Sequence, residues 1–422
     1  MSFLKKRRKA IWTEGNTVSE TVYEICTFLL FIGYFLFYDN RGLQLVAVGI
    51  GLGGAVLLFF SKVFMARLKV PLNTIWYILF FFLAELSALW AHSPEDAIIS
   101  YLRLMMVLLA VCFSITLYVD TTQQAERMIK IFVASAFVFS AVQFFFTPID
   151  SLLNGFFGSA VGDNNTNNYG YIVSVCTIVS FYFAYIKNQK SYNFLALFFV
   201  VCCFLTSSRK SLIVTFLGVV LLIALSSKKR NRFFHLFIGL FLVAFFVVMM
   251  FEDEFLYKII GNRFDSMLTL LITGYNPKET SMSLRAYFIE FAKILLREKP
   301  LLGHGFANFL TIIATEGDLD MGYTTHNNYW EILADLGIVG FLMYYWFYIF
   351  IVIKLAIRMF RERENTLLPL AMTLIICQFA VEYGLITMVS FYPQIVVSLI
   401  YVCTYASDSK RKFHYSPSVN VR

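Results

Sequence analysis

Residues 299–310, KPLLGHGFANFL, and residues 324–350, TTHNNYWEILADLGIVGFLMYYWFYIF, form the part of the chain around which the rest is organised. The first segment contains a glycine turn, at Gly303 and Gly305. The second begins with a histidine, His326, between polar residues and continues as a long apolar run. The apolar run is long enough to predict a helix that enters a membrane.

The residues around His326 predict that this helix begins within one or two positions of the histidine. Four neighbours carry side-chain oxygens that cap helices: Thr324, Thr325, Asn327 and Asn328. The first amides of a helix are unsatisfied and carry partial positive charge, which disfavours protonation of a histidine and attracts anions. This is a suitable place for a neutral general base beside a phosphate. The alternative is that His326 only caps the helix at a membrane surface.

The composition of the whole chain excludes an ordinary soluble protein. Of 422 residues, 59% are hydrophobic, 18% are aromatic and 15% are charged, whereas globular proteins carry about 25% charged residues. The mean hydropathy is +0.69. The apolar residues come in blocks of about 17–25, the length at which a helix crosses the hydrocarbon core of a bilayer. We therefore expect an all-α, polytopic membrane protein.

Twelve apolar blocks are predicted to be transmembrane helices. They lie at about 22–38, 43–60, 72–90, 98–118, 128–147, 168–186, 192–206, 210–226, 233–251, 330–356, 366–385 and 389–406. The chain is thereby divided into a basic N-terminus at 1–21, nine spans within 22–251, a large loop at 252–327, three spans within 328–406 and a tail at 407–422.

The positions of lysine and arginine predict which side of the membrane each loop faces. Runs such as KKRRK (5–9) and SSKKRNR (226–232) fall on one side, whereas the short loops of the other side hold only Arg41, Arg209 and Lys210. Basic residues collect in cytoplasmic loops, so both termini are predicted to be cytoplasmic. His326 is then predicted to be extracytoplasmic. This distribution accounts for the net charge of +8 without a nucleic-acid partner.

The large outer loop, 252–327, is too long to be a simple connection, and loops of this length are usually functional. Within it, SMSLRAYFIEFAKILLREKP (281–300) places apolar residues at helical spacing and is predicted to be an amphipathic helix that lies over the bundle. A second outer loop, 148–167, runs into the sequence GDNNTNN, whose asparagines suit either sugar hydroxyls or polar turns.

Two arginines on the predicted outer side are candidate phosphate ligands. Arg209 begins the span at 210–226, and Arg285 lies near the start of the amphipathic helix. Guanidinium groups bind phosphate oxygens bidentately and stay charged at any relevant pH. Two of them beside a helix N-terminus would hold a diphosphate. The alternative for each is a surface arginine that extends to the interface or pairs with a carboxylate.

Charged residues inside predicted spans lie in the same outer half. Glu85 and Arg103 are each about five residues from the outer end of their spans, so at about 1.5 Å per residue they share a depth and can pair. Glu382 lies near the outer end of its span. Charges at such positions usually face an interior cavity. Glu85 and Arg103 either form a purely structural ion pair or support a functional site.

Two further polar residues are candidate supporting positions. His304 lies between the glycines of GHG and is either a loop residue or a substrate contact, and Asn327 follows the candidate base. The seven cysteines all fall in apolar segments without metal-binding spacing. No Walker A loop, nucleophile elbow or paired aspartates of a metal site are present, so we predict neither a metal nor a cofactor.

Three segments, in order, resemble the O-antigen ligase and O-antigen or capsular polysaccharide polymerase family of bacterial envelope proteins. TSSRKSLIVTFLGV (206–219) is similar to the family's serine–arginine start of a span. SLRAYFIEFAKILLREKPLLGHGFANF (283–309) resembles its arginine-headed helix, proline and glycine-x-glycine turn. THNNYWEILADLGIVGFL (325–342) is similar to its histidine–asparagine helix start and glycine pair.

The resemblance implies a glycosyltransferase of the bacterial cytoplasmic membrane that takes a glycan from a polyprenyl diphosphate carrier on the outer face. Carried over by position, Arg209 and Arg285 would hold the diphosphate, and His326 would deprotonate the acceptor hydroxyl. The family implies inversion without a metal, and two cations can stabilise a diphosphate leaving group. The implied partners are the lipid-linked oligosaccharide, membrane lipid and chain-length regulator or flippase proteins.

Several functions stay open at this point. A polymerase extends another lipid-linked glycan, whereas a ligase transfers to a lipid or protein acceptor; we favour a polymerase because nothing marks a protein-acceptor specialist. A polysaccharide transporter or flippase is an alternative of another class. Transporters of this kind carry repeated halves and charges near the midplane, whereas here the charges lie toward one face. A scaffold protein is a third alternative.

Overall fold

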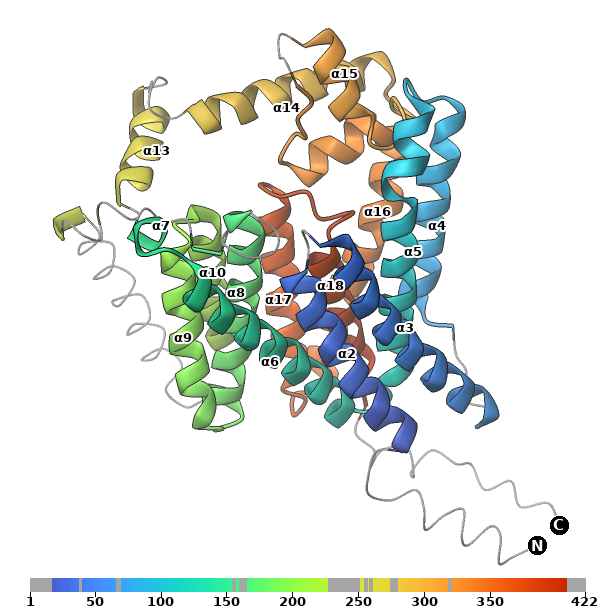
Figure 1. The fold of residues 1–422 in the computed structure, drawn as a ribbon, viewed down its shortest axis with the longest axis vertical. Coiled ribbons are helices and arrows are strands. Elements are labelled where there is room, and N and C mark those ends of the chain that lie inside the picture. Colours follow the sequence, from blue (N-terminus) through green and yellow to red (C-terminus); the bar gives the residue numbers. More distant parts are fainter. Residues whose placement is uncertain are drawn as a thin grey trace, which may run out of the picture.

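The computed structural model describes residues 17–37, 40–65, 70–153, 157–158, 165–226, 251–253, 257, 261–273, 280–317 and 321–407 (Figure 1). These residues form helices and connecting turns. Among them no β-strand occurs, and one isolated bridge joins Thr121 to Ser407. The all-α prediction is therefore confirmed.

Eleven of the predicted spans coincide with helices of the described part. These are α2 (Val18–Leu36), α3 (Arg41–Phe64), α4 (Leu72–Leu86), α5 (Pro94–Tyr118), α6 (Thr122–Phe146), α8 (Thr166–Phe181), α9 (Ser191–Leu205), α10 (Arg209–Leu225), α16 (Asn328–Arg361), α17 (Leu367–Glu382) and α18 (Phe391–Tyr405). The ninth predicted span, 233–251, lies outside the described residues except for Phe251. The count of twelve stays a prediction.

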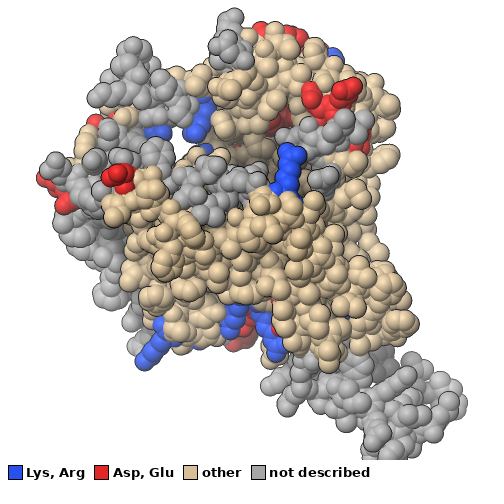
Figure 2. All heavy atoms as spheres, viewed as in Figure 1, with Lys and Arg blue, Asp and Glu red and all other residues tan. Residues whose placement is uncertain are grey.

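Six of the described helical segments are long and apolar enough to cross a membrane. They are α2, α3, α6, α16, α4 with its extension η1 (Ser87–Leu89), and α8 with its extension η2 (Tyr182–Ile186). Figure 2 shows a broad uncharged band with charged residues gathered above and below it. Large apolar side chains such as Phe82 and Phe145 are exposed, at 64% and 87%. These features indicate a multi-pass membrane protein.

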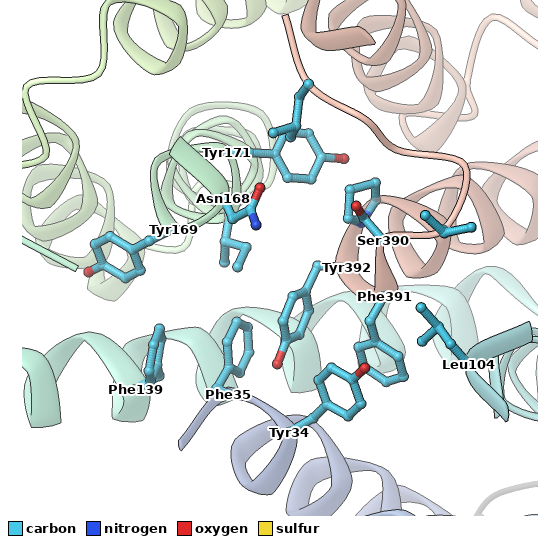
Figure 3. Close-up of a pocket in the computed structure, with 14 residues that line it drawn as sticks. Tyr34, Phe35, Leu104, Phe139, Asn168, Tyr169, Tyr171, Ser390, Phe391 and Tyr392 are labelled. Atoms are coloured by element: carbon cyan, nitrogen blue, oxygen red, sulfur yellow. The ribbon is translucent and has the colours of Figure 1, made fainter. Parts of the chain in front are cut away.

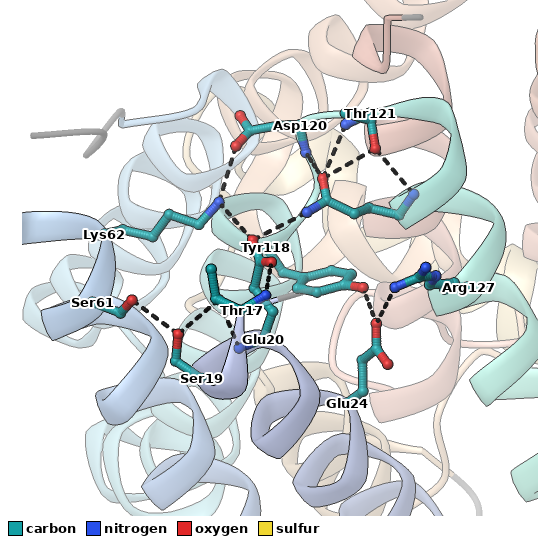
Figure 4. Close-up of polar contacts among 11 residues, drawn as sticks. Thr17, Ser19, Glu20, Glu24, Ser61, Lys62, Tyr118, Asp120, Thr121 and Arg127 are labelled. Carbon is teal, nitrogen blue, oxygen red and sulfur yellow. Dashed lines mark hydrogen bonds and ion pairs between the residues drawn. The ribbon is translucent and has the colours of Figure 1, made fainter. Parts of the chain in front are cut away.

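Buried charges close the end of the bundle where α2 begins. Lys62 of α3 is 3% exposed and lies 2.9 Å from Asp120 and 3.6 Å from Glu20 (Figure 4). Glu24 accepts a hydrogen bond from the hydroxyl of Tyr118. Because buried charges are costly unless they are paired, these contacts join α2, α3 and the α5–α6 turn at one level.

The long helix α16 is interrupted at Gly337, whose backbone has φ 62° and ψ −163°. A helix break leaves amide and carbonyl groups without intrahelical partners. The turn at 299–305 supplies these partners: the amide of Ile338 donates to the carbonyl of Pro300 at 2.9 Å, and that of Val339 donates to Leu301 at 3.1 Å. The glycine is required because a Cβ here would overlap the Leu301 carbonyl oxygen.

The glycine-x-glycine turn satisfies the other side of the same break. The amide of His304 donates to the carbonyl of Ala334 at 3.1 Å, and the amide of Gly305 donates to Asp335 at 2.8 Å. Gly303 has φ 64°, and a Cβ on it would lie 2.5 Å from the carbonyl group of Asp335. The two glycine motifs therefore dock backbone to backbone.

The same turn is fastened to the α4–α5 connection. The amide of Phe306 donates to the Ser87 hydroxyl at 2.8 Å, and the indole of Trp90 donates to the carbonyl of Leu302 at 3.1 Å. The turn thus joins the α4–α5 connection to α16.

Three helices of the predicted outer loop lie across one end of the bundle (Figure 1): α13 (Asn262–Thr273), α14 (Thr280–Glu298) and α15 (Asn308–Glu316). Helix α14 confirms the predicted amphipathic helix. Of its predicted apolar face, Phe288 and Leu295 are 2% exposed, whereas Tyr287 and Ile294 are 36% and 49% exposed. Helices α13 and α15 were not predicted from the sequence. The position of this loop outside the membrane stays a prediction.

We predict that Gly337→Ala destabilises the protein by about 1–3 kcal/mol, because this backbone conformation is open almost only to glycine and the added methyl group would displace the 299–305 turn. The measurement is thermal unfolding of the purified protein in detergent. Gly53→Ala in α3 is the matched control, since a Cβ there meets no atom within 4 Å. Equal melting temperatures for the two variants would contradict the prediction.

Candidate functional site

Side chains from three distant segments form a basic cluster, defined here as Arg209, Lys210, Arg285 and His326. The charges of Arg285 and Lys210 act on the His326 imidazole. Those of Arg285 and Arg209 act on the Lys210 ammonium. The structure therefore brings together Arg285 of α14, His326 and the start of α10. Arg209 is included because it adjoins Lys210 in the chain and its charge acts on the Lys210 side chain.

The cluster lies between α14 and the bundle. In Figure 2 the surface is hollowed between α14 and the upper ends of α8, α10 and α17, and lysine or arginine atoms border the hollow.

His326 directly precedes α16, as predicted, but it does not cap this helix. Asn327 is the cap, and its side chain accepts hydrogen bonds from the amides of Tyr329 at 3.0 Å and Trp330 at 3.3 Å. The alternative in which His326 itself caps the helix is therefore wrong. His326 has φ 52°, a left-handed conformation that is uncommon for non-glycine residues and concentrated at functional sites.

The imidazole of His326 is half-buried beside aromatic rings of α14 and of the segment before α16. Its centroid lies 6.3 Å from that of Phe288 on α14, which stacks on Tyr323 at 5.3 Å. Burial, and then the charges of Arg285 and Lys210, lower the pKa of His326 from 6.5 to about 4. The imidazole is therefore neutral at pH 7 and has a free lone pair with which to accept a proton.

Lys210 is the member of the cluster that the sequence analysis did not select. Its ammonium group donates a hydrogen bond to the carbonyl of Gly384, in the turn between α17 and α18. Two features of the sequence could have identified it: it adjoins Arg209, and basic residues are scarce in the predicted outer loops.

The loop before α10 is held in a fixed conformation. Ser207 has φ 52°, and the hydroxyl of Ser208 donates to the side-chain oxygen of Asn167 at 3.1 Å. Ser211 in turn donates to Ser208 at 2.9 Å. These contacts fix the first turn of α10, on which Arg209 and Lys210 lie, against the start of α8.

The predicted supporting residues lie in different surroundings. His304 contacts the carbonyl of Leu295 at 3.0 Å and Glu298 at 3.6 Å, in the turn that docks on α16, and burial lowers its pKa. Glu85 has one buried carboxylate oxygen without a hydrogen-bond partner among the described residues. The side chain of Arg103 lies outside the described residues, so the predicted Glu85–Arg103 pair stays a prediction.

Glu382 is fully buried and is already surrounded by hydrogen-bond donors. Its carboxylate accepts from Tyr345 at 2.7 Å, Tyr348 at 3.0 Å, Gln378 at 2.9 Å and Thr387 at 2.7 Å. Four donors satisfy most of the lone pairs of a carboxylate. Their positions explain why Glu382 is tolerated inside the bundle without any contact with a substrate.

The chemistry of the cluster suits an anion. Two guanidinium groups carry fixed positive charge, and with the Lys210 side chain they lie near an imidazole that is neutral. Phosphate oxygens are the preferred partners of such donors. In the described part of the chain, no group of three His, Cys, Asp or Glu side chains is placed to hold a metal ion.

We predict that the reactivity of His326 toward diethyl pyrocarbonate stays constant from pH 8 to about pH 5 and falls only as the pH approaches 4, because only the neutral imidazole reacts and its pKa is lowered to about 4. In Arg285→Gln the loss of a positive charge removes part of the cause, so the fall should begin at a higher pH. Modification at position 326 is followed by mass spectrometry. A wild-type transition centred near pH 6.5 would contradict this prediction.

Comparison with known proteins supports one family. No curated protein matches the chain. Residues 194–345 match the family model described as O-antigen ligase, and this segment contains all four residues of the basic cluster. The match supports the resemblance noted in the sequence. We conclude that residues 194–345 of this membrane protein carry a domain of the O-antigen ligase family.

Proposed function

We propose that the protein is a membrane glycosyltransferase that takes oligosaccharide units from a polyprenyl diphosphate carrier on the outer face of the bacterial cytoplasmic membrane. The observation that carries this proposal is the convergence of Arg285 and Lys210 on a neutral His326, with Arg209 beside Lys210. A diphosphate-binding cluster and a base are the two elements that transfer from a glycosyl diphosphate requires.

In the proposed reaction, an acceptor hydroxyl oxygen forms a bond to the anomeric carbon of the donor sugar. The bond between that carbon and the diphosphate oxygen breaks, and the diphosphate leaves with the electron pair. His326 accepts the hydroxyl proton on an imidazole nitrogen. Because the acceptor attacks opposite the leaving group, the anomeric configuration inverts.

Arg209, Lys210 and Arg285 stabilise the charge that develops on the leaving diphosphate. Fixed donors in a site of low dielectric constant stabilise such charge strongly. In many phosphoryl enzymes this role belongs to a metal ion, and here we assign it to the three cations. The binding of the anionic substrate also raises the pKa of His326 from its low value, which makes the imidazole a better base during the reaction.

For the acceptor, we propose a growing lipid-linked glycan, which makes the protein a polymerase. A ligase that transfers to a lipid or protein acceptor would use the same donor chemistry. Incubation of the purified protein with lipid-linked oligosaccharide alone distinguishes them, because only a polymerase makes longer glycans on the carrier. Chain-length regulators and flippases are proposed as partners on the family resemblance.

We predict that Arg209→Ala, Arg285→Ala and His326→Ala each lower kcat/KM by about 10²–10³-fold or more, as expected for loss of a charge-stabilising donor or a general base. The assay is transfer from lipid-linked oligosaccharide by purified protein without divalent metal. Arg297→Ala on α14 and His92→Ala just before α5 change exposed positions outside the basic cluster. These matched controls should retain activity.

The outcome is decisive for each residue separately. Wild-type activity in any of the three variants would remove that residue from the mechanism. Failure of transfer in the wild type, together with carrier movement across the membrane, would favour the transporter alternative.

A further inference from the structure

A pocket near the basic cluster has no role in the chemistry described so far. It opens among α2, α6, α8 and α18 and has a volume of about 110 Å³ (Figure 3). Its lining includes aromatic rings and polar groups from segments far apart in the sequence: Tyr34, Phe35, Phe139, Asn168, Tyr171, Ser390 and Tyr392. We call it the aromatic pocket.

The walls of the aromatic pocket are rigid. Phe35 stacks on Tyr392 at 3.9 Å between ring centroids and on Phe139 at 4.7 Å. Tyr34 stacks on Phe391 at 3.8 Å. Because each ring is held by another, the pocket keeps its shape without a ligand, as pre-formed small-molecule sites do.

Polar groups occupy defined positions on these walls. Figure 3 shows the amide of Asn168 and the hydroxyl groups of Ser390 and Tyr392 around the open space. The Tyr171 hydroxyl donates to Gln378 at 2.7 Å, so this ring is fixed as well. Aromatic faces combined with a few directed polar groups suit a ligand that has an apolar face and a polar edge.

The aromatic pocket lies next to the basic cluster. A second, smaller pocket is lined by Lys210, Ser211 and Asn167, and it shares Tyr171 and Leu385 with the aromatic pocket. The two spaces are therefore separated by a single layer of side chains. A ligand whose anionic group lies at Lys210 therefore has its next chemical group beside Tyr171 and Leu385, which also line the aromatic pocket.

We propose that the aromatic pocket binds a sugar ring of the donor, the one linked directly to the diphosphate; this inference rests on the proposed function. A pyranose has an apolar face of C–H groups that packs on aromatic rings, and hydroxyl groups around its edge that bind amides and hydroxyls. In the donor, this sugar is bonded directly to the diphosphate. In the protein, the aromatic pocket shares two lining residues with the pocket at Lys210.

The polyprenyl chain fits this space poorly. A long isoprenoid needs an extended apolar groove, whereas the aromatic pocket is compact and carries an amide and several hydroxyl groups on its walls. The polyprenyl chain is better accommodated on the surface of the bundle, where large apolar side chains are exposed.

The test compares equilibrium binding of two probes to the full-length protein in lipid nanodiscs. One is undecaprenyl diphosphate, and the other is the lipid-linked oligosaccharide extracted from the membranes of the host cell. The pocket variants are Asn168→Ala and Tyr392→Leu. Matched controls at exposed positions are Asn193→Ala on α9 and Phe145→Leu on α6, and thermal unfolding verifies that each variant is folded.

We expect wild type to bind the glycan-bearing probe about tenfold more tightly than undecaprenyl diphosphate, the gain of one stacked and hydrogen-bonded ring. Asn168→Ala and Tyr392→Leu should abolish this preference and leave the affinity for undecaprenyl diphosphate unchanged. Arg285→Ala should weaken the binding of both probes by the same factor. The control variants should behave as wild type.

Equal weakening of both probes in the pocket variants, or an undiminished preference for the glycan, would overturn the assignment of the pocket. This readout does not require turnover. Absence of transfer in the wild type with an intact, pocket-dependent glycan preference would refute the proposed function and support the pocket. Active transfer with no such preference would refute the pocket alone.

Discussion

The interaction on which this structure depends is the backbone pairing between the broken helix α16 and the turn at 299–305. A break at Gly337 leaves amides and carbonyls unpaired, and such groups are costly at a position buried from water. Four hydrogen bonds from the turn, two on each side of the break, supply the missing partners. Glycines at 303 and 337 permit the approach because neither adds a Cβ between the two backbones.

This pairing also places the helices that carry the candidate site. Asp335, directly before the break, accepts hydrogen bonds from the amides of Ala307 and Phe309 at 2.9 and 2.8 Å and so fixes the start of α15. Helix α14, which ends at the turn, is thereby held over the first part of α16. Arg285 on α14 consequently lies near enough to His326 for its charge to lower the pKa of the imidazole. The hydrogen bonds of Asn327 fix the backbone beside that imidazole.

The electrostatics of the basic cluster match the chemistry proposed for it. Burial, and then the positive charges of Arg285 and Lys210, lower the pKa of His326 and keep its imidazole neutral. In the proposed reaction, a bound diphosphate would neutralise these positive charges and bring the reacting sugar beside the base. The same arrangement that disfavours the empty cluster therefore favours an anionic ligand, and the aromatic pocket extends the site to the sugar that follows.

The sequence alone determined the all-α membrane class, the position of eleven helices, the start of α16 and the amphipathic α14, because these depend on local composition, periodicity and capping residues. It also selected Arg209, Arg285 and His326, partly through family resemblance, as residues of unusual type for their positions. It did not reveal α15, the docking of the two glycine motifs, Lys210 as a neighbour of His326, or the aromatic pocket. Each of these depends on contacts between segments tens to hundreds of residues apart, and only the tertiary structure decided them, because local sequence patterns do not specify which distant side chains share a buried space.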